Sequence, residues 1–193
     1  MSLLNDLIIS KVRVKLLEIF LSSPGQIIHV RELVRKAGEE INAVRRELQH
    51  LEKVGAVTKE RRANRLYYAF RKDYPLYFDL LELIAKTHGL GGAILKNRNK
   101  LGKVKFAMLS GKYARNTPGN PDNVDLLIVG EVVVPEVAAL VREEELRRNR
   151  EIFFTPMTED EFVFRKKKKD PFLLSILSGS RFMVVGDEEE LVS

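Results

Sequence analysis

The stretch that decides the fold spans residues 41–71 and reads INAVRRELQHLEKVGAVTKERRANRLYYAFR. Its first half predicts an amphipathic helix over 41–54, because apolar side chains recur along one face at helical spacing. This stripe consists of Ile41, Val44, Leu48, Leu51 and Val54. Gly55 then supplies a helix stop. We therefore expect one side of this helix to pack against the protein core.

The opposite side of the same helix carries polar and cationic side chains. Asn42, Arg46, Gln49 and Lys53 are expected to point away from the core, and Arg45 to lie on the flank. Side chains of these types reach base edges and phosphates in complexes with DNA. The alternative is the ordinary solvated face of a surface helix, since a charged outer side is common to such helices.

After the helix stop, the sequence predicts a short basic hairpin with strands at 56–60 and 66–70 and a turn at 61–65. Its cationic and amide side chains are Lys59, Arg61, Arg62, Asn64 and Arg65. A polar-faced helix followed by a cationic hairpin is typical of a helix-turn-helix with a wing, which enters DNA grooves. We expect 41–54 in the major groove and a wing over 58–68 on the backbone or in the minor groove.

Two helices are predicted before this stretch. The first spans 10–21, with Ser10 suited to cap it. The second spans 29–37 and is closed by Gly38, about four residues before the polar-faced helix. A turn of that length lets two helices cross as a helix-turn-helix requires. We expect His29 to be a capping or surface residue and not a metal ligand.

The positive charge of the chain is concentrated near its beginning. The 193 residues carry a net charge of +6 and allow one large domain or two small ones. Residues 1–73 contain 15 Lys and Arg against 9 Asp and Glu, whereas the rest contains 18 of each kind. The whole excess therefore lies in the first segment, as expected when one domain meets a polyanion and the other does not.

Composition excludes several classes of protein. No run of about 18 apolar residues predicts a membrane span, and no basic and apolar leader opens the chain. Cysteine is absent, which excludes a disulfide framework and any thiolate metal site. We therefore expect a cytoplasmic protein without a membrane association.

Residues 12–70, and above all HVRELVRKAGEEINAVRRELQHLEKVGAVTKERRANRLYYAF at 29–70, resemble the winged helix-turn-helix of ArsR-like transcriptional regulators. The resemblance covers about a third of the chain. It implies that 41–54 is the recognition helix, that 58–68 is the wing and that double-stranded DNA is the partner. The thiolate pairs of metal-sensing relatives have no counterpart in this sequence.

A connector over 74–102 is expected to follow this DNA-binding domain, which we assign to 1–73. Its first helix, over 74–84, has Pro75 near the first turn and an aromatic stripe that suits either a core or a dimer seam. The glycines at 89–92 are expected to break it, and 93–101 to resume a basic helix. We expect a homodimer that pairs through this connector and the first helix of the chain.

From residue 103 the pattern becomes alternating and predicts a small α/β domain over 103–193 on a mixed sheet. The expected strands are 104–109, 124–129, 151–154 and 182–185, with a loop over 110–123. The expected helices are 135–148, 159–168 and 171–177, and the acidic segment 186–190 is left without a function. The fold class is thus α+β, with a winged helix-turn-helix before the α/β domain.

The segment AMLSGKYARNTPGNPDNVDLLIVGE at 107–131 resembles the minimal nucleotidyltransferase domain, which often follows a winged helix in prokaryotic proteins. In that family a Gly-Ser loop holds nucleotide phosphates and two aspartates hold divalent metal. Gly111 matches the glycine, whereas Lys112 stands in the serine position. Asp125 matches the second aspartate, but Asn123 replaces the first.

Too few carboxylates remain for the chemistry of that family. The strand expected to carry a third one reads Ile-Phe-Phe at 152–154, and Asp122 should point away from Asp125 because strand side chains alternate. Lys112 is expected close to the carboxylate of Asp125, where it would compete with a metal. Mg²⁺ needs converging carboxylates, so Asp125 is interpreted as a vestigial metal position. We expect no catalysis, no metal and no cofactor.

Several functions remain open for the second domain. Gly111, Lys112 and Arg115 could bind a small anionic effector or a nucleotide without metal; the alternative is a scaffold or dimerisation surface. The basic run at 165–169 suits a solvated helix end or DNA backbone contact. The preferred function is a sequence-specific transcriptional regulator that binds double-stranded DNA. The alternatives are a metal-dependent nucleotidyltransferase tethered to nucleic acid and an antitoxin-like protein that binds a partner.

Overall fold

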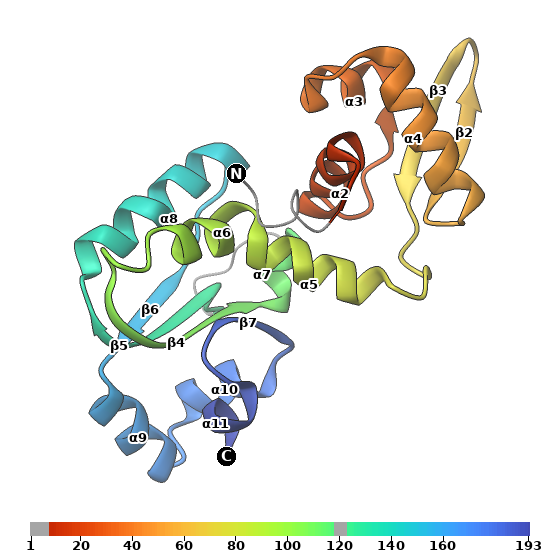
Figure 1. Ribbon diagram of the computed structural model, residues 1–193. Coiled ribbons are helices and arrows are strands. Elements are labelled where there is room, and N and C mark those ends of the chain that lie inside the picture. The colour runs from red at the N-terminus through yellow and green to blue at the C-terminus, as the bar shows by residue number, and fades with distance from the viewer. Residues whose placement is uncertain (1–7, 118–122) are drawn as a thin grey trace. The chain divides into compact units, whose positions relative to one another are not determined.

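The computed structural model describes residues 8–117 and 123–193 (Figure 1). The chain is a mixed α+β protein that splits into two compact units, Met1–Ile84 and Ala85–Ser193. Each unit contains one sheet, and helix α5 crosses the boundary between the units. In the described part of the chain, no helix has the length and apolar character that a membrane span needs.

Unit 1 combines helices with a three-stranded antiparallel sheet in the order β1-β3-β2. Its elements are α2 (Lys11–Ser22), β1 (Ile28–His29), α3 (Val30–Ala37), α4 (Ile41–Lys53), β2 (Val57–Arg62), β3 (Arg65–Phe70) and the larger part of α5 (Tyr77–Thr87). The first two predicted helices are present within one residue of the expected bounds. The Ser10 hydroxyl accepts a hydrogen bond from the Arg13 amide and so caps α2 as expected.

The caps of the next two helices follow local chemistry. The His29 Nδ1 atom accepts a hydrogen bond from the Arg31 amide, which confirms the capping role of His29 at α3. Gly38 ends α3 in the left-handed region at φ 61°, where an L side chain would be strained. The Glu40 carboxylate accepts the amides of Asn42 and Ala43 and begins α4, a cap that the sequence analysis did not identify.

Helix α4 buries the middle of its predicted apolar stripe. Val44, Leu48 and Leu51 are buried against the rest of unit 1, and Ile41 is half-buried. Val54 does not belong to the stripe, because its side chain is 46% exposed. The reason is that Val54 is the C-cap residue, beyond the last helical turn. The inward side of α4 is therefore shorter than predicted.

The hairpin is longer and its turn tighter than predicted. Strands β2 and β3 pair without interruption out to Arg62 opposite Arg65. Only Ala63 and Asn64 remain between the strands, and Ala63 adopts a positive φ of 51°. The predicted five-residue turn at 61–65 is thus wrong, because cross-strand pairing continues through three of its residues. The arginines lie on the last strand positions.

The helical structure breaks at His88, directly before the glycine segment, and not over 89–92 as predicted. The first connector helix begins at Tyr77 and continues to Thr87, and α6 (Gly89–Lys96) starts at the glycines themselves. The predicted helix over 93–101 therefore begins and ends too late. A Cβ atom on Gly91 would lie 2.0 Å from the Ala85 carbonyl oxygen. Gly91 is thus needed because the first turn of α6 packs directly on the last turn of α5.

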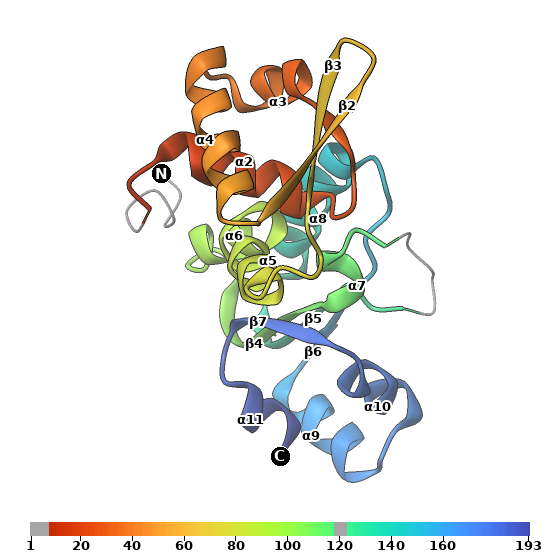
Figure 2. The ribbon, with the colours of Figure 1, turned by 90° about the vertical axis from the view of Figure 1, so that its right-hand side faces the viewer.

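Unit 2 contains a four-stranded mixed sheet in the order β6-β5-β4-β7, as the expected mixed sheet requires. Its strands are β4 (Gly102–Ser110), β5 (Leu126–Val132), β6 (Phe154–Met157) and β7 (Arg181–Val185). Among the described strand pairs of this sheet, β5 and β6 alone run parallel, and α8 (Val134–Arg148) joins them. Figures 1 and 2 show α6 and α8 on one face of this sheet. The other face carries α9 (Glu159–Lys167), α10 (Pro171–Ser178) and α11 (Glu188–Val192).

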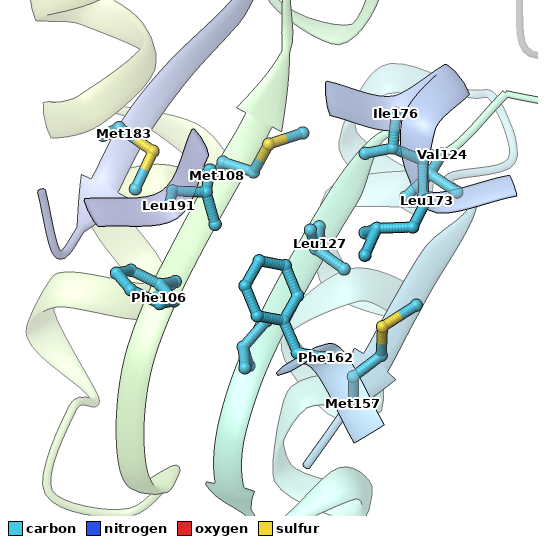
Figure 3. Packing of buried hydrophobic residues seen from close by; sticks show 11 residues of the cluster. Phe106, Met108, Val124, Leu127, Met157, Phe162, Leu173, Ile176, Met183 and Leu191 are labelled. Carbon is cyan, nitrogen blue, oxygen red and sulfur yellow. The ribbon is translucent and has the colours of Figure 1, made fainter. Parts of the chain in front are cut away.

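The structure corrects three predictions for unit 2, namely the starts of two strands and the beginning of the loop over 110–123. Strands β5 and β6 begin two and three residues later than expected, at Leu126 and Phe154. The predicted loop over 110–123 begins with a short helix, α7 (Gly111–Ala114). The acidic segment enters α11, because Asp187 caps its first turn and Leu191 is buried. Figure 3 shows Leu191 in the apolar cluster beneath the sheet, with Phe106, Met108, Leu127, Phe162 and Leu173.

Candidate nucleic-acid interface and the polar sites of unit 2

The outward face of α4 is exposed along its whole length. It consists of Asn42, Arg45, Arg46, Gln49 and Lys53, as predicted from helical spacing. Within residues 8–117 and 123–193, none of these five side chains forms a hydrogen bond or an ion pair. Four polar or cationic positions and one flanking arginine are therefore presented to solvent by one rigid helix.

An inward-facing carboxylate fixes the rotation of α4. Glu47 accepts a hydrogen bond from the Ser10 hydroxyl at 2.7 Å and an ion pair from Arg13 Nε at 2.8 Å. Burial alone would raise the pKa of Glu47, but the hydrogen bonds from Ser10 and Arg13 lower it. Because both partners belong to the N-terminal end of α2, Glu47 locks the opposite face of α4 toward solvent. The role of Glu47 is not predictable from local sequence, because its partners are more than 30 residues away.

The hairpin cations divide into partnered and unpartnered groups. The Lys59 ammonium lies 3.1 Å from the Glu52 carboxylate, and Arg62 forms a two-point ion pair with Glu60 at 2.8 and 2.9 Å. Arg61 Nε donates to the Ala63 carbonyl at 3.3 Å. Asn64 and Arg65 are exposed at the tip, and no described residue accepts a hydrogen bond from their side chains.

The carboxylates beside these cations were not identified from the sequence. Glu52 belongs to α4 and Lys59 to β2, so their pairing depends on how the helix meets the hairpin. Glu52 and Glu60 thus lie beside Lys59 and Arg62, two cations that were predicted to contact phosphates. The hairpin therefore carries less uncompensated positive charge than its lysine and arginine content suggests.

In unit 2, two of the three predicted anion-binding residues line one pocket. The pocket has a volume of about 190 Å³ and is lined by Ser110, Lys112, Arg115, Asn123, Val124, Ser175, Ile176, Gly179 and Ser180. Gly111 contributes little, because its amide donates to the Ser180 carbonyl at 2.6 Å. The Arg115 guanidinium donates to the Ser180 hydroxyl at 3.2 Å. Ser180 was not singled out, since it is distant in sequence.

Asp125 is an internal anchor in this fold. Its carboxylate is 3% exposed, accepts Arg150 Nη2 at 3.0 Å and accepts the Phe153 amide at 3.2 Å. The predicted proximity of Lys112 to the Asp125 carboxylate is wrong, because the Lys112 ammonium donates to the Asn123 amide oxygen at 2.6 Å instead. Both carboxylate oxygens of Asp125 are thus already bonded. Asp122 lies outside the described residues, and the described part contains no group of three or more potential carboxylate, His or Cys metal ligands.

A buried polar cluster lies next to this anchor. Glu144 on α8 is 5% exposed and accepts the Tyr113 hydroxyl at 2.7 Å, Arg147 at 2.6 and 2.7 Å, and Arg148 at 2.6 Å. The Arg148 guanidinium also covers the Tyr113 ring at 4.0 Å from its centroid. Arg150 lies 5.6 Å from the same centroid. We call these five residues the Glu144 cluster.

Charge, not hydration, stabilises the carboxylate of this cluster. Burial would raise the pKa of Glu144, but the hydrogen bond from Arg147 and the charges of Arg148 and Arg147 lower it to about 2. Burial raises the pKa of the Tyr113 hydroxyl, so this group is a protonated donor at neutral pH. The cluster was missed in the sequence because its members combine two helices and a loop.

The basic run at 165–169 lies at the end of α9, where some of its side chains have partners within the fold and others are exposed. Arg165 is bound to Glu161 and Asp170, and Lys166 donates to the Leu191 carbonyl at 2.7 Å. The side chains of residues 167–169 are exposed. Only these last three lysines therefore resemble the solvated helix end that the sequence predicts.

Comparisons with protein-family models, with curated proteins and with solved structures found no match to this chain.

Proposed function

We propose that the chain is a transcriptional regulator that binds double-stranded DNA sequence-specifically through unit 1. In this proposal α4 enters the major groove, and the β2–β3 hairpin contacts the backbone or the minor groove. The observation that carries the proposal is the exposed outer face of α4, whose cationic and amide side chains have no partner among the described residues. Such groups satisfy their hydrogen bonds on base edges and phosphates.

The arrangement of unit 1 supports this function. Helix α3 is followed after Gly38, Glu39 and Glu40 by α4, and α4 is followed by a hairpin that it contacts through β2. Figures 1 and 2 show the hairpin extending beside α4. We interpret this as a winged helix-turn-helix, with α4 as the recognition helix and β2–β3 as the wing.

The electrostatic part of the proposal is tested by the salt dependence of binding. If about six phosphates are neutralised, the slope of log affinity against log salt should be about −5. We would measure this by fluorescence anisotropy of labelled duplex DNA. An affinity that stays flat between low and physiological salt would contradict the proposal.

A charge-matched pair of variants tests where the DNA binds. Arg45→Ala with Arg46→Ala removes two positive charges from α4, whereas Arg98→Ala with Lys100→Ala removes two exposed charges from unit 2. We expect the first pair to lower affinity for a site selected from random DNA at least about tenfold and the second pair to change it little. Equal losses would mean that α4 is not the binding face.

We further propose a homodimer, because a symmetric operator needs two recognition helices about one helical turn apart. The expected seam includes the start of α5, where Phe78 is 60% exposed and Leu76 is also exposed. Helix α2 offers less, since it buries most of its apolar side chains within unit 1. Sedimentation should show a dimer at tens of micromolar and a monomer for Phe78→Asp. A wild-type monomer with tight specific binding would contradict this.

For unit 2 we propose binding of a small anion without catalysis. The supporting observations are the pocket shared by Lys112 and Arg115 and the occupation of both Asp125 oxygens by Arg150 and Phe153. A fluorescent ATP analogue should bind in excess chelator, and Lys112→Ala should abolish this whereas the exposed Lys103→Ala should not. Metal-dependent nucleotide transfer that Asp125→Ala abolishes would instead favour the nucleotidyltransferase alternative.

A further inference from the structure

A second and larger cavity lies in unit 2, on the face of the sheet that carries α9 and α11. Its volume is about 400 Å³, which lies within the range of small-molecule sites. It is lined by Lys105, Phe106, Val129, Glu159, Phe162, Val163, Lys166, Lys167, Glu190 and Ser193. None of these residues lines the pocket at Lys112, so the two cavities are separate sites.

The floor of this cavity is apolar. Phe106 from β4 and Phe162 from α9 lie with ring centroids 5.9 Å apart, and Val129 from β5 is fully buried beside them. Figure 3 shows Phe106 and Phe162 as part of the buried cluster beneath the sheet. At the rim, Val163 is 45% exposed. An apolar ligand body could therefore contact the buried floor and remove Val163 from water.

The two lysines at the rim, Lys105 and Lys166, differ in whether a carboxylate neutralises their charge. The Lys105 ammonium lies between two carboxylates, 3.3 Å from Glu159 and 3.1 Å from Glu190. The Lys166 ammonium donates to the Leu191 carbonyl and lies 5.5 Å from the Phe162 ring centroid. Among the residues that the structure describes, no carboxylate pairs with Lys166. Lys166 is thus a half-buried cation that faces a carbonyl dipole and an aromatic ring.

Burial lowers the pKa of Lys166, because no counter-ion among the described residues offsets the loss of hydration of its charged form. A carbonyl oxygen satisfies one of the three ammonium protons but does not neutralise the charge. The complement that this site lacks is therefore a single negative group beside an apolar surface. Lys167 lines the same rim and is exposed, so it adds a second positive charge at the opening.

We propose that this cavity binds a small amphipathic carboxylate, with its apolar body on Phe106, Phe162 and Val163 and its carboxylate on Lys166. The charge complementarity selects an anion, and the apolar floor selects against an inorganic ion. This site does not depend on the DNA-binding function of unit 1.

Three probes that share one alkyl chain test the ligand class. Calorimetric titration of the full chain with octanoate, 1-octanol and octylammonium at neutral pH compares negative, neutral and positive head groups. We expect octanoate to bind at least about tenfold more tightly than octanol, and octylammonium to bind most weakly. Equal affinity for octanoate and octanol, or no saturable octanoate binding in the millimolar range, would overturn the proposal.

Two neighbouring substitutions on α9 place the ligand. Val163→Asp and Phe164→Asp add the same charge at exposed apolar positions, but only Val163 lines the cavity. We expect Val163→Asp to weaken octanoate at least about tenfold and Phe164→Asp to leave it nearly unchanged. Because both side chains are exposed, both variants should fold, which circular dichroism verifies. Equal effects of the two variants would place the ligand elsewhere.

A third pair of variants tests the role of the lysine itself. Lys166→Gln keeps a donor for the Leu191 carbonyl but removes the charge, whereas Lys168→Gln removes an exposed charge that does not line the cavity. We expect Lys166→Gln to abolish the preference for octanoate over octanol, and Lys168→Gln to preserve it. Preference that survives in Lys166→Gln would exclude Lys166 as the carboxylate partner.

Discussion

Two pairs of arginines in this molecule have the same chemistry and opposite circumstances. Arg45 and Arg46 on α4 are exposed, and no described residue forms an ion pair with them. Arg148 and Arg150 in unit 2 are largely buried, and each has its guanidinium bound to a carboxylate. Arginine content alone therefore does not identify a surface for a polyanion. The number of internal carboxylates that each guanidinium meets is what separates a binding surface from a structural core.

The same contrast is visible in the distribution of charge along the sequence. Residues 1–73 carry more cations than internal carboxylates can meet, whereas the remaining sequence has equal numbers of the two. In unit 2, the buried Arg148 and Arg150 are bound within the fold to the carboxylates of Glu144 and Asp125. Removing a buried carboxylate should therefore destabilise unit 2, and removing a cation from α4 should affect only binding.

The largest expected effect is the loss of the buried carboxylate at the centre of unit 2. Glu144→Gln leaves the guanidinium of Arg148 buried without its anion, so we expect a loss of about 3 to 5 kcal/mol in unfolding free energy. Urea denaturation followed by circular dichroism measures this, and amide hydrogen exchange of β5 assigns it to unit 2. Glu143→Gln, one residue earlier and exposed, should change stability by less than about 0.5 kcal/mol. Similar values for both variants would refute the clustering argument.

Acid should weaken unit 2 through the same residue. The folded-state pKa of Glu144 is about 2, below its ordinary value of 4.5. Its stabilising contribution, about 3 kcal/mol, is therefore complete above about pH 4.5 and is lost as the pH falls through 2. Between pH 5 and pH 2.5 we expect about 2 kcal/mol of this contribution to disappear. Urea denaturation at both pH values should show a smaller decrease for Glu144→Gln; an equal decrease would assign the acid sensitivity to other groups.

The exposed face of α4, in contrast to the buried arginines of unit 2, should discriminate between DNA sequences. We expect Arg46→Ala or Gln49→Ala to cost about 1 to 3 kcal/mol on a site selected from random DNA and little on unselected DNA. Arg62→Ala should weaken both alike, because its place on the hairpin suits backbone contact. Anisotropy titrations on the two DNAs measure this. Equal losses on both DNAs from the α4 variants would show that α4 does not discriminate sequence.

The smallest effect should come from releasing a hairpin cation from its internal partner. Glu52→Gln frees Lys59, so we expect DNA affinity to rise about twofold and the salt dependence to steepen slightly. Glu131→Gln, which releases the exposed Lys103 in unit 2, is the matched control and should leave affinity unchanged. An equal gain from the control would indicate a general charge effect.

Helical periodicity was sufficient to predict the two faces of α4, because burial of Val44, Leu48 and Leu51 depends only on spacing along one helix. Short-range capping chemistry likewise predicted Ser10. The hairpin turn was predicted too long, because strand pairing up to Arg62 and Arg65 depends on Ala63 accepting a positive φ. Alanine carries no sequence signal for that conformation.

The polar sites of unit 2 could not be predicted because their partners are distant in sequence. The resemblance at 107–131 directed attention to Asp125 and Lys112, but not to Arg150, which lies beyond α8. The late start of β6 has the same cause. The Phe153 amide bonds to the Asp125 carboxylate, so only the Phe153 carbonyl, which accepts the Asp125 and Leu126 amides, takes part in backbone pairing before β6 begins at Phe154.

The strand order of unit 2 has a consequence for the order of synthesis. Strand β4 pairs with β5, which follows it closely, and with β7, whose Met183 lies opposite Met108. Until residues 181–185 leave the ribosome, one edge of β4 therefore has no neighbour. An open edge of apolar strand is a template for pairing with other chains. A chain truncated before Arg181 should thus aggregate. Unit 1 can already have folded by then, because all three strands of its sheet are complete at residue 70.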